Sequence, residues 1–382
     1  MGLSHFRGKE NESMSVISEK FTVSPIHLFF IMYVSIVDVS ILSFQREAVM
    51  DAGHDAWVSM LLVWISSHII VWMMYKILSN QNPVNSDFVS INHAYFGKFL
   101  GACINQAIIL YFVLGALVVY RSYLEAVLVI IFPTMSLWPI SIVFLLLIYY
   151  AVSGGFQTVA GICFWAFLIL IIVFPPLFLL LIPFLHPQNL MPFLNHSPVQ
   201  ILKSSHQITF SFYGAEVLLG IYPYIRTQAK SQKWAHLAVG YAGFVFLVTL
   251  VVGLMYFNQY QIQHLVWAVL KAIGILQLPL LQRLEYLILS IWLVKTVASV
   301  SVGLWIACHS WKKLWRTKPS HNLIVILFLF VILQLFIKDP EQLLAVKKLH
   351  VNVGFYFVYA YIPLMFIITM ASKKFSAIRK LR

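Results

Sequence analysis

Charge is scarce in this sequence: only 10% of its 382 residues are Asp, Glu, Lys or Arg, whereas an average soluble domain has about 25%. The apolar set reaches 61%, against roughly 45–50% in soluble domains. Such a composition, with 15% aromatic residues, excludes a disordered chain, a coiled coil and a nucleic-acid-binding domain, because each of these is far more polar. It indicates a protein that crosses the bilayer several times.

Motifs for chemistry are missing too. The three cysteines, Cys103, Cys163 and Cys308, fall inside apolar runs, so we expect small buried hydrophobic residues rather than a disulfide or metal framework. There is no metal-ligand spacing, no P-loop and no nucleophile elbow, and the polar segments are too short to form a catalytic domain. We therefore expect no enzyme, no metal and no cofactor.

Ten apolar segments have the length of a membrane-spanning helix, which is about 20 residues. They predict an all-α polytopic membrane protein with ten transmembrane helices. A further amphipathic stretch, His264 to Gln277, is too short to span and is expected at the membrane interface or over a site. The ten segments are residues 25–45, 56–78, 99–120, 137–153, 156–183, 204–225, 234–257, 284–309, 320–337 and 352–371.

The distribution of Lys and Arg predicts the orientation of these spans. Residues 1–24 are polar and carry no cleavable signal peptide, so the first apolar run is expected to be the insertion signal. With ten spans both termini share one side, and that side holds seventeen Lys and Arg against eight on the other, with Lys295 inside a span. The positive-inside rule then places segment 1–24 and the basic tail, 372–382, in the cytoplasm, on either side of one transmembrane domain, 25–371.

Three ionisable residues lie midway through predicted spans: Asp38 in the first, Glu216 in the sixth and Lys295 in the eighth. An ionised side chain at the membrane centre costs at least about 2.5–3.5 kcal/mol, so such positions are expected to be functional. They can form a charged cluster for a ligand or a static ion pair that locks three helices, and the sequence leaves both open. Nearer the surface, Arg121 and Glu125 have the i, i+4 spacing of a helical ion pair, and we expect them to pair.

The first and sixth spans contain weak points. Small and hydroxyl residues surround Asp38, and Gly214 follows aromatic residues just before Glu216. An unwound span frees backbone N–H and C=O groups, which is tolerated only where they line a cavity, and the half-helix ends offer partial charges to a ligand. These spans are corresponding members of two sets of five, the pattern of a transporter-type site. Close helix packing around small residues is the alternative.

Four passages occur in a specific order along the chain: SILSFQREAVMDAGHDAW (Ser40 to Trp57), NLMPFL (Asn189 to Leu194), TFSFYGAEVLLGIYP (Thr209 to Pro223) and QRLEYLILSIW (Gln282 to Trp292). In these passages the chain resembles the spore germination permease family, the B subunits of spore germinant receptors, within the amino acid–polyamine–organocation superfamily. Family members commonly have glycines in the first-span break, where this chain has Asp38 and Ser40. The backbone there is therefore expected to be less open, or the ligand to contact the Asp38 carboxylate.

The resemblance implies two inverted five-helix repeats, about 25–183 and 204–371, with spans one and six unwound at a central pocket. It implies a nutrient sensor of the spore inner membrane that binds a small polar molecule such as an amino acid, works with an A subunit and a C-subunit lipoprotein, and triggers germination. A secondary transporter for an amino acid or amine is the alternative, and an assembly protein with static buried charges is a third. The implied pocket residues are Val37, Asp38, Val39, Ser40, Ile41, Phe210, Ser211, Phe212, Tyr213, Gly214, Glu216, Lys295 and Thr296.

Overall fold

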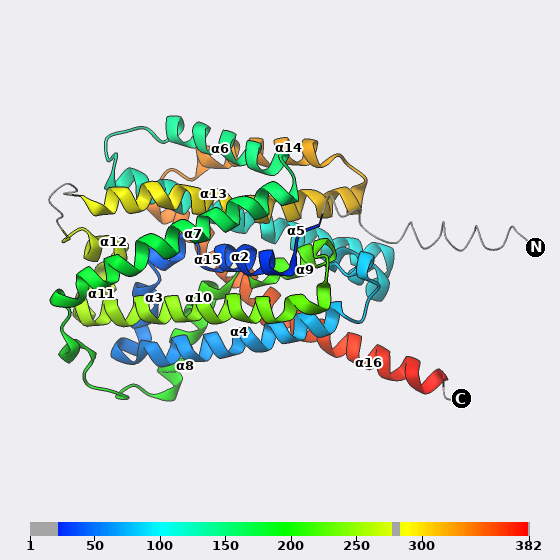
Figure 1. Cartoon of the computed structure of the whole chain (residues 1–382), viewed down its shortest axis with the longest axis horizontal. Coiled ribbons are helices and arrows are strands. Elements are labelled where there is room, and N and C mark those ends of the chain that lie inside the picture. The colour runs from blue at the N-terminus through cyan, green and yellow to red at the C-terminus, as the bar shows by residue number, and fades with distance from the viewer. Residues whose placement is uncertain (1–21, 277–282, 381–382) are drawn as a thin grey trace, which may run out of the picture.

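The computed structural model describes residues 22–276 and 283–380, and within these ranges every regular element is helical (Figure 1). Seven helices there are long and apolar enough to cross a membrane, and two shorter apolar helices, α2 and α6, accompany them. The chain is thus an all-helical, multi-pass membrane protein. Its helices are α2 (Pro25–Ile36), α3 (Gln45–Ala52), α4 (Ala56–Leu78), α5 (Phe88–Ile130), α6 (Leu137–Ser153), α7 (Phe156–Leu181), α8 (Pro198–Gln207), α9 (Leu218–Ile221), α10 (Gln228–Tyr256), α11 (Gln259–His264), α12 (Ala268–Ile273), α13 (Leu284–Trp315), α14 (Pro319–Phe336), α15 (Pro340–Tyr356) and α16 (Ile362–Lys380).

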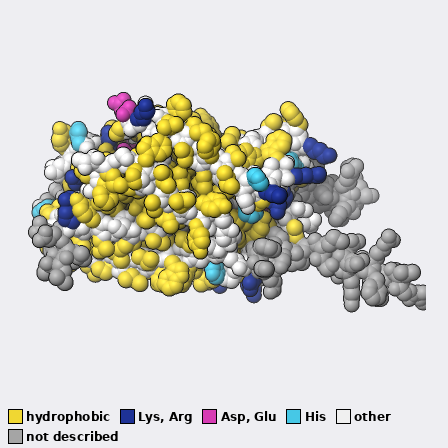
Figure 2. Space-filling view, turned by 90° about the horizontal axis from the view of Figure 1, so that it is seen from above, with side chains coloured by type: hydrophobic (Ala, Val, Ile, Leu, Met, Phe, Trp, Pro, Cys, Tyr) yellow, Lys and Arg dark blue, Asp and Glu magenta, His cyan; other side chains and the backbone are white. Residues whose placement is uncertain are grey.

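The helices run roughly along the long axis of the molecule. In Figure 1, α6 and α14 form one edge, α4 and α8 lie toward the other, and α2 lies in the middle. Helix α13 contacts α5, α6, α7 and α14, so it joins the first edge to the centre. Hydrophobic side chains cover the middle of the face in Figure 2, while Lys and Arg gather toward its two ends. This is the surface that a bilayer requires, with apolar atoms facing the lipid and charges at the interfaces.

Most predicted spans coincide with single helices. Helices α4 and α6 have the predicted bounds, and α10 and α13 extend beyond theirs. The predicted third span lies within α5, which folds back on itself at Gly97, where φ is +73°. The Nδ2 of Asn92 donates to the Oδ1 of Asn105 at 2.8 Å, a contact that thirteen residues of straight helix, about 20 Å long, do not allow.

Two further stretches and one cysteine can be compared with the sequence expectation. The predicted tenth span, 352–371, begins inside α15 and continues through a π-helical turn, η10 (Phe357–Tyr361), into α16. The amphipathic stretch 264–277 contains α12, after the end of α11, and its last residue lies outside the described ranges. The expectation for Cys103 was wrong: its side chain is exposed on the outer surface of the bundle, while Cys163 and Cys308 are buried.

The predicted first and sixth spans are both interrupted. The first, 25–45, contains α2 and a 3-10 turn η2 (Val39–Leu42) and ends at the first residue of α3, and we call residues 37–38 the first break. The sixth consists of α8, the 3-10 turns η7 (Thr209–Phe212) and η8 (Ala215–Val217), and α9, and we call residues 213–214 the second break.

Hydrogen bonds hold the two interrupted spans together at both ends. Where the chain enters α2, the N–H of Val23 donates to the carbonyl of Tyr224 at 2.9 Å, and the N–H of Arg226 donates to the carbonyl of Val23 at 3.0 Å. On the other side of the breaks, the hydroxyl of Ser204 in α8 donates to the carbonyl of Ala48 in α3 at 2.7 Å. The breaks are therefore held next to each other in the centre of the bundle.

Candidate functional site

At the first break, a hydrogen bond from the backbone to the Asp38 side chain takes the place of a helical backbone hydrogen bond. Helix α2 ends at Ile36, and Asp38 is extended, with φ −94° and ψ −160°. Its Oδ1 accepts the N–H of Ser40 at 2.7 Å, so the half-buried carboxylate caps the turn η2 that follows. The apolar residues of this segment, Val37, Val39 and Ile41, are buried. Asp38 thus satisfies one backbone group that the missing helical turn leaves free.

The second break depends on Gly214. This residue has φ +107°, which side-chain-bearing residues rarely adopt. A Cβ here would lie 2.4 Å from the carbonyl oxygen of Ser35 and 2.9 Å from the N of Ile36. The turn at Gly214 therefore packs directly on the backbone at the end of α2. The second break therefore lies against the backbone immediately before the first break, with no side chain of residue 214 between them.

Glu216 folds back onto the second break. Its side chain is almost fully buried, and the N–H of Gly214 donates to Oε1 at 2.9 Å and to Oε2 at 2.8 Å. The hydroxyl of Tyr111, from α5, donates to Oε1 at 2.6 Å. These bonds compensate the carboxylate for the loss of water, since a buried acceptor without donors is destabilising.

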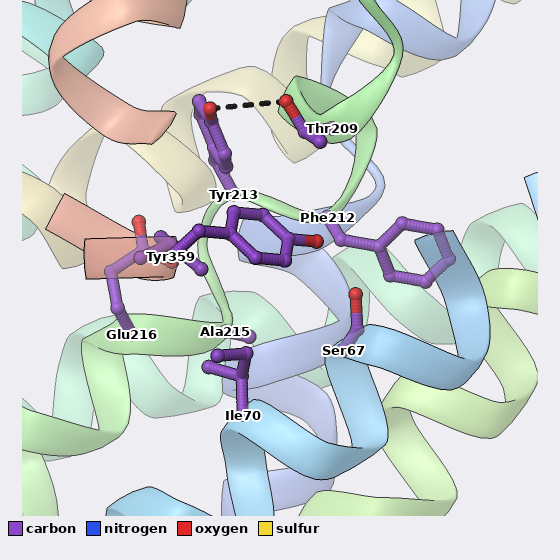
Figure 3. A pocket seen from close by; sticks show the side chains of 9 residues that line it. Ser67, Ile70, Thr209, Phe212, Tyr213, Ala215, Glu216 and Tyr359 are labelled. Atoms are coloured by element: carbon purple, nitrogen blue, oxygen red, sulfur yellow. Dashed lines mark hydrogen bonds between the residues drawn. The ribbon is translucent and has the colours of Figure 1, made fainter. Parts of the chain in front are cut away.

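A very small cavity lies beside Glu216 (Figure 3). Its volume is about 10 Å³, space for about one water molecule. Tyr213 and Thr209 share a hydrogen bond of 3.2 Å across one end of it, and Phe212 points away toward a neighbouring helix. Helix α4 and the π-helical turn η10 close the other sides, so the site is shut around Glu216. The lining residues are Ser67, Ile70, Thr209, Phe212, Tyr213, Ala215, Glu216, Val358 and Tyr359.

Lys295 belongs to the first break rather than to Glu216. It lies on α13 and is 1% exposed, and among the described residues its Nζ has no hydrogen-bond partner and no ion pair. Its Nζ lies 5.4 Å from the centre of the Trp292 ring. The three ionisable residues are thus in different surroundings: neutral donors satisfy Glu216, the Asp38 carboxylate caps η2, and the Lys295 ammonium has no hydrogen-bond or ion-pair partner among the described residues.

The other predicted site residues are distributed around these two centres. Ser211 and Phe212 are buried, Phe210 is half-buried, and the ring of Phe212 packs on Phe246 of α10 at 5.8 Å. The Thr296 hydroxyl donates to the carbonyl of Trp292 at 2.8 Å, so it is used within α13.

Two residues that contact the predicted site residues were not predicted from the sequence. Tyr111 carried no signal, because it is one of several tyrosines in apolar helices. Trp292 did carry one, since it lies three residues before Lys295 and therefore on the same face of a helix. The predicted Arg121–Glu125 pair is wrong: Arg121 donates from Nη2 to the carbonyl of Ile337 at 2.9 Å, and Glu125 pairs with Lys347 at 3.2 Å.

Interrupted helices that meet in the middle of an apolar bundle, with a carboxylate and an ammonium beside them, define a membrane protein with a transporter-like fold. The chain resembles a solved Na⁺-coupled sialic acid symporter with a TM-score of 0.60, at 13% identity, over 91% of this chain and 77% of the symporter. That likeness concerns the fold alone.

Sequence comparison identifies the family. The model of the spore permease family, described as spore germination protein, matches residues 22–343, and the chain belongs to this family. It is similar to spore germination protein GerQB of Bacillus cereus, with 34% identity over 94% of this chain and 99% of GerQB. Spore germination protein YndE of Bacillus subtilis (strain 168) is 21% identical over 84% of this chain and 88% of YndE.

Proposed function

We propose that this chain is the nutrient-sensing membrane subunit of a spore germinant receptor, and that a small polar molecule such as an amino acid binds between the two breaks. The observation that carries the proposal is the direct contact of Gly214 with the end of α2, together with two almost fully buried ionisable side chains, Glu216 and Lys295. Unwound backbone and ionisable groups at membrane depth are expected at a ligand site. Membership of the spore permease family supports the connection to germination.

The proposal includes an architecture of ten transmembrane helices in two inverted repeats of five, about 25–183 and 204–371. Support comes from the positions of the breaks, which fall in the first and the sixth of the ten apolar segments. The excess of Lys and Arg on the side of the termini supports a cytoplasmic location for both. We place the chain in the spore inner membrane, together with an A subunit and a C-subunit lipoprotein.

Sensing then requires the site to open. The cavity at Glu216 has room for about one water molecule, so a nutrient binds only when the helices around the breaks separate. A ligand shifts such an equilibrium only by its difference in affinity for the two states. The nutrient favours the open arrangement, and the change in helix packing carries the signal to partner subunits. No catalytic step is involved.

Spores provide the test. Spores that lack the gene are complemented with the wild-type chain, with Asp38→Asn, with Glu216→Ala or with Glu341→Gln, a control on the exposed surface of α15. Germination is measured as the loss of optical density with a panel of amino acids, sugars and nucleosides. We expect both break variants to lose the response to at least one nutrient, and the control to keep it. Normal germination of both break variants with every nutrient would contradict the proposal.

A secondary transporter for an amino acid or amine is a second candidate, because the fold neighbour is a symporter. The two candidates differ in whether the chain alone moves an amino acid across a membrane. The purified chain is reconstituted alone into vesicles, and the uptake of radiolabelled amino acids is measured with and without ion gradients. Uptake by the chain without an A subunit would favour the transporter, and its absence would count against it. Genes for an A subunit and a lipoprotein beside this gene would favour the receptor.

A further inference from the structure

Two buried hydrogen-bond donors on one face of α13 have no acceptor. The Nζ of Lys295 and the Nε1 of Trp292 are both buried, and neither has a hydrogen-bond partner in the part of the chain that the structure describes. The two residues are three positions apart, so their side chains share a helix face, and the ammonium lies 5.4 Å from the indole ring. Both groups are donors only, because neither an ammonium nor an indole N–H can accept.

The depth of this pair makes the lack of an acceptor among the described residues costly. Lys295 is the twelfth residue of α13, about 17 Å from the start of that helix, and is therefore deep within the bundle. An ionised group buried without a partner is destabilising, and the face of Trp292 offsets only part of that cost. The indole is held in place by Phe174 of α7, whose ring centre lies 5.1 Å away. A fixed pair of donors with one positive charge is complementary to an anionic acceptor.

Asp38 does not fill this role. Its charge acts on Lys295, but its carboxylate forms no ion pair with it and is instead engaged by the N–H of Ser40. Asp38 does limit the charge of a ligand, because it repels a second anion. A carboxylate carries a single negative charge, whereas a phosphate group carries about −1.5 to −2 at neutral pH and would be opposed more strongly.

We propose that Lys295 and Trp292 form a carboxylate-binding subsite, so that the molecule sensed at the first break carries a carboxylate group. This deepens the proposed function and rests on it, since it names the chemical class of the ligand. Lys295 binds one carboxylate oxygen through Nζ, and the N–H of Trp292 binds the other.

The test uses the full-length chain in lipid nanodiscs and small probes at constant ionic strength. Thermal unfolding is followed against the concentration of propionate, of its neutral analogue propionamide and of inorganic phosphate. Propionate is expected to stabilise the wild-type chain, while propionamide has no effect and phosphate less effect than propionate. Lys295→Met should weaken the apparent affinity for propionate more than tenfold. Trp292→Phe, which keeps the ring and removes only the N–H, should weaken it by about tenfold.

Lys271→Met serves as the control, because it removes a positive charge from the exposed end of α12 and should leave the response to propionate unchanged. Absence of stabilisation by propionate, equal effects of propionate and propionamide, a larger effect of phosphate, or an unchanged response in Lys295→Met would each overturn the subsite. If Lys295→Met does not fold, the subsite is tested by Trp292→Phe and by the comparison of propionate with propionamide in the wild-type chain. A spore response that needs this chain but only a neutral sugar would overturn the subsite and leave the proposed sensor intact.

Discussion

At the second break, Glu216 accepts the free N–H of Gly214 and the hydroxyl of Tyr111, so its hydrogen bonds are provided by the protein. At the first break, the one donor to the Asp38 carboxylate within the described residues is the N–H of Ser40, and the Nζ of Lys295 has no hydrogen-bond partner there. The two interruptions therefore differ in how their ionisable side chains are hydrogen-bonded. The carboxylate at the second break is satisfied by donors of the protein, whereas the ammonium of Lys295 has no acceptor among the described residues.

From this difference we infer that the two breaks have different roles. A satisfied polar network in a low-dielectric interior makes the structure around it rigid, whereas an unsatisfied group is a source of free energy for binding. We therefore assign the second break mainly to holding the fold and the first break mainly to recognition. If the contrast holds, substitutions at the second break lower the stability of the chain more than substitutions at the first break.

The largest effect is expected from Gly214→Ala. The new methyl group would lie 2.4 Å from the Ser35 carbonyl oxygen, at a φ that alanine avoids, so we expect a loss of about 4 kcal/mol or more. The measurement is the amount of folded chain in membranes, followed by SDS titration of the purified protein. Gly303→Ala is the matched control, since its Cβ would have only ordinary contacts, the nearest at 3.5 Å. Equal yields of the two variants would show that the breaks need no close contact.

A smaller loss is expected from Tyr111→Phe. The change keeps the ring but removes the donor to Glu216, which should lower the free energy of unfolding by about 1–3 kcal/mol. Tyr123→Phe is the control, because its hydroxyl also donates to a buried acceptor, the neutral carbonyl of Leu289. SDS titration in mixed micelles compares the two. A larger loss in the control would mean that the carboxylate at the second break does not depend on Tyr111.

The helices themselves were largely predictable from the sequence. The bounds of α4 and α6 agree because clear polar or glycine-containing turns flank uninterrupted apolar runs. The bounds of α15 were missed, because Glu341 to Lys348 is polar and a hydropathy window cannot distinguish a helix outside the bilayer from a loop. The fold of α5 at Gly97 was missed as well, because the third segment was predicted to begin at residue 99 and no helix was predicted directly before that glycine.

The candidate site was predictable in its positions but not in its partners. A charged residue in an apolar run is visible in the sequence, and so is a glycine beside it, which is why Asp38, Gly214, Glu216 and Lys295 were found. Tyr111 reaches Glu216 from 105 positions away, and such contacts depend on tertiary packing. Local spacing misled at Arg121 and Glu125, since i, i+4 neighbours pair only when no better partner lies across the helix interface. Ligand binding by these residues stays a prediction.

Asp38→Asn is expected to change stability less than Tyr111→Phe does. Asparagine caps a turn about as well as aspartate, and Asp38 is only half-buried, so the free energy of unfolding should change by less than about 1 kcal/mol. The same variant is expected to lose a nutrient response in spores, which would separate recognition from folding. A stability loss as large as that of Tyr111→Phe, measured by the same titration, would show that both breaks hold the fold equally.

The smallest effect is expected from Ser40→Ala, next to Asp38. The backbone N–H of Ser40 holds the Asp38 carboxylate, but its buried Oγ has no hydrogen-bond partner in the described ranges. Alanine keeps the N–H and removes only the unused hydroxyl, so the free energy of unfolding should stay within about 0.5 kcal/mol of the wild-type value. Thr209→Val is the contrasting variant at the other break, because it removes a hydroxyl that is bonded to both His206 and Tyr213. If Ser40→Ala proves the more destabilising of the two, the first break is held by contacts of its own and the contrast between the breaks fails.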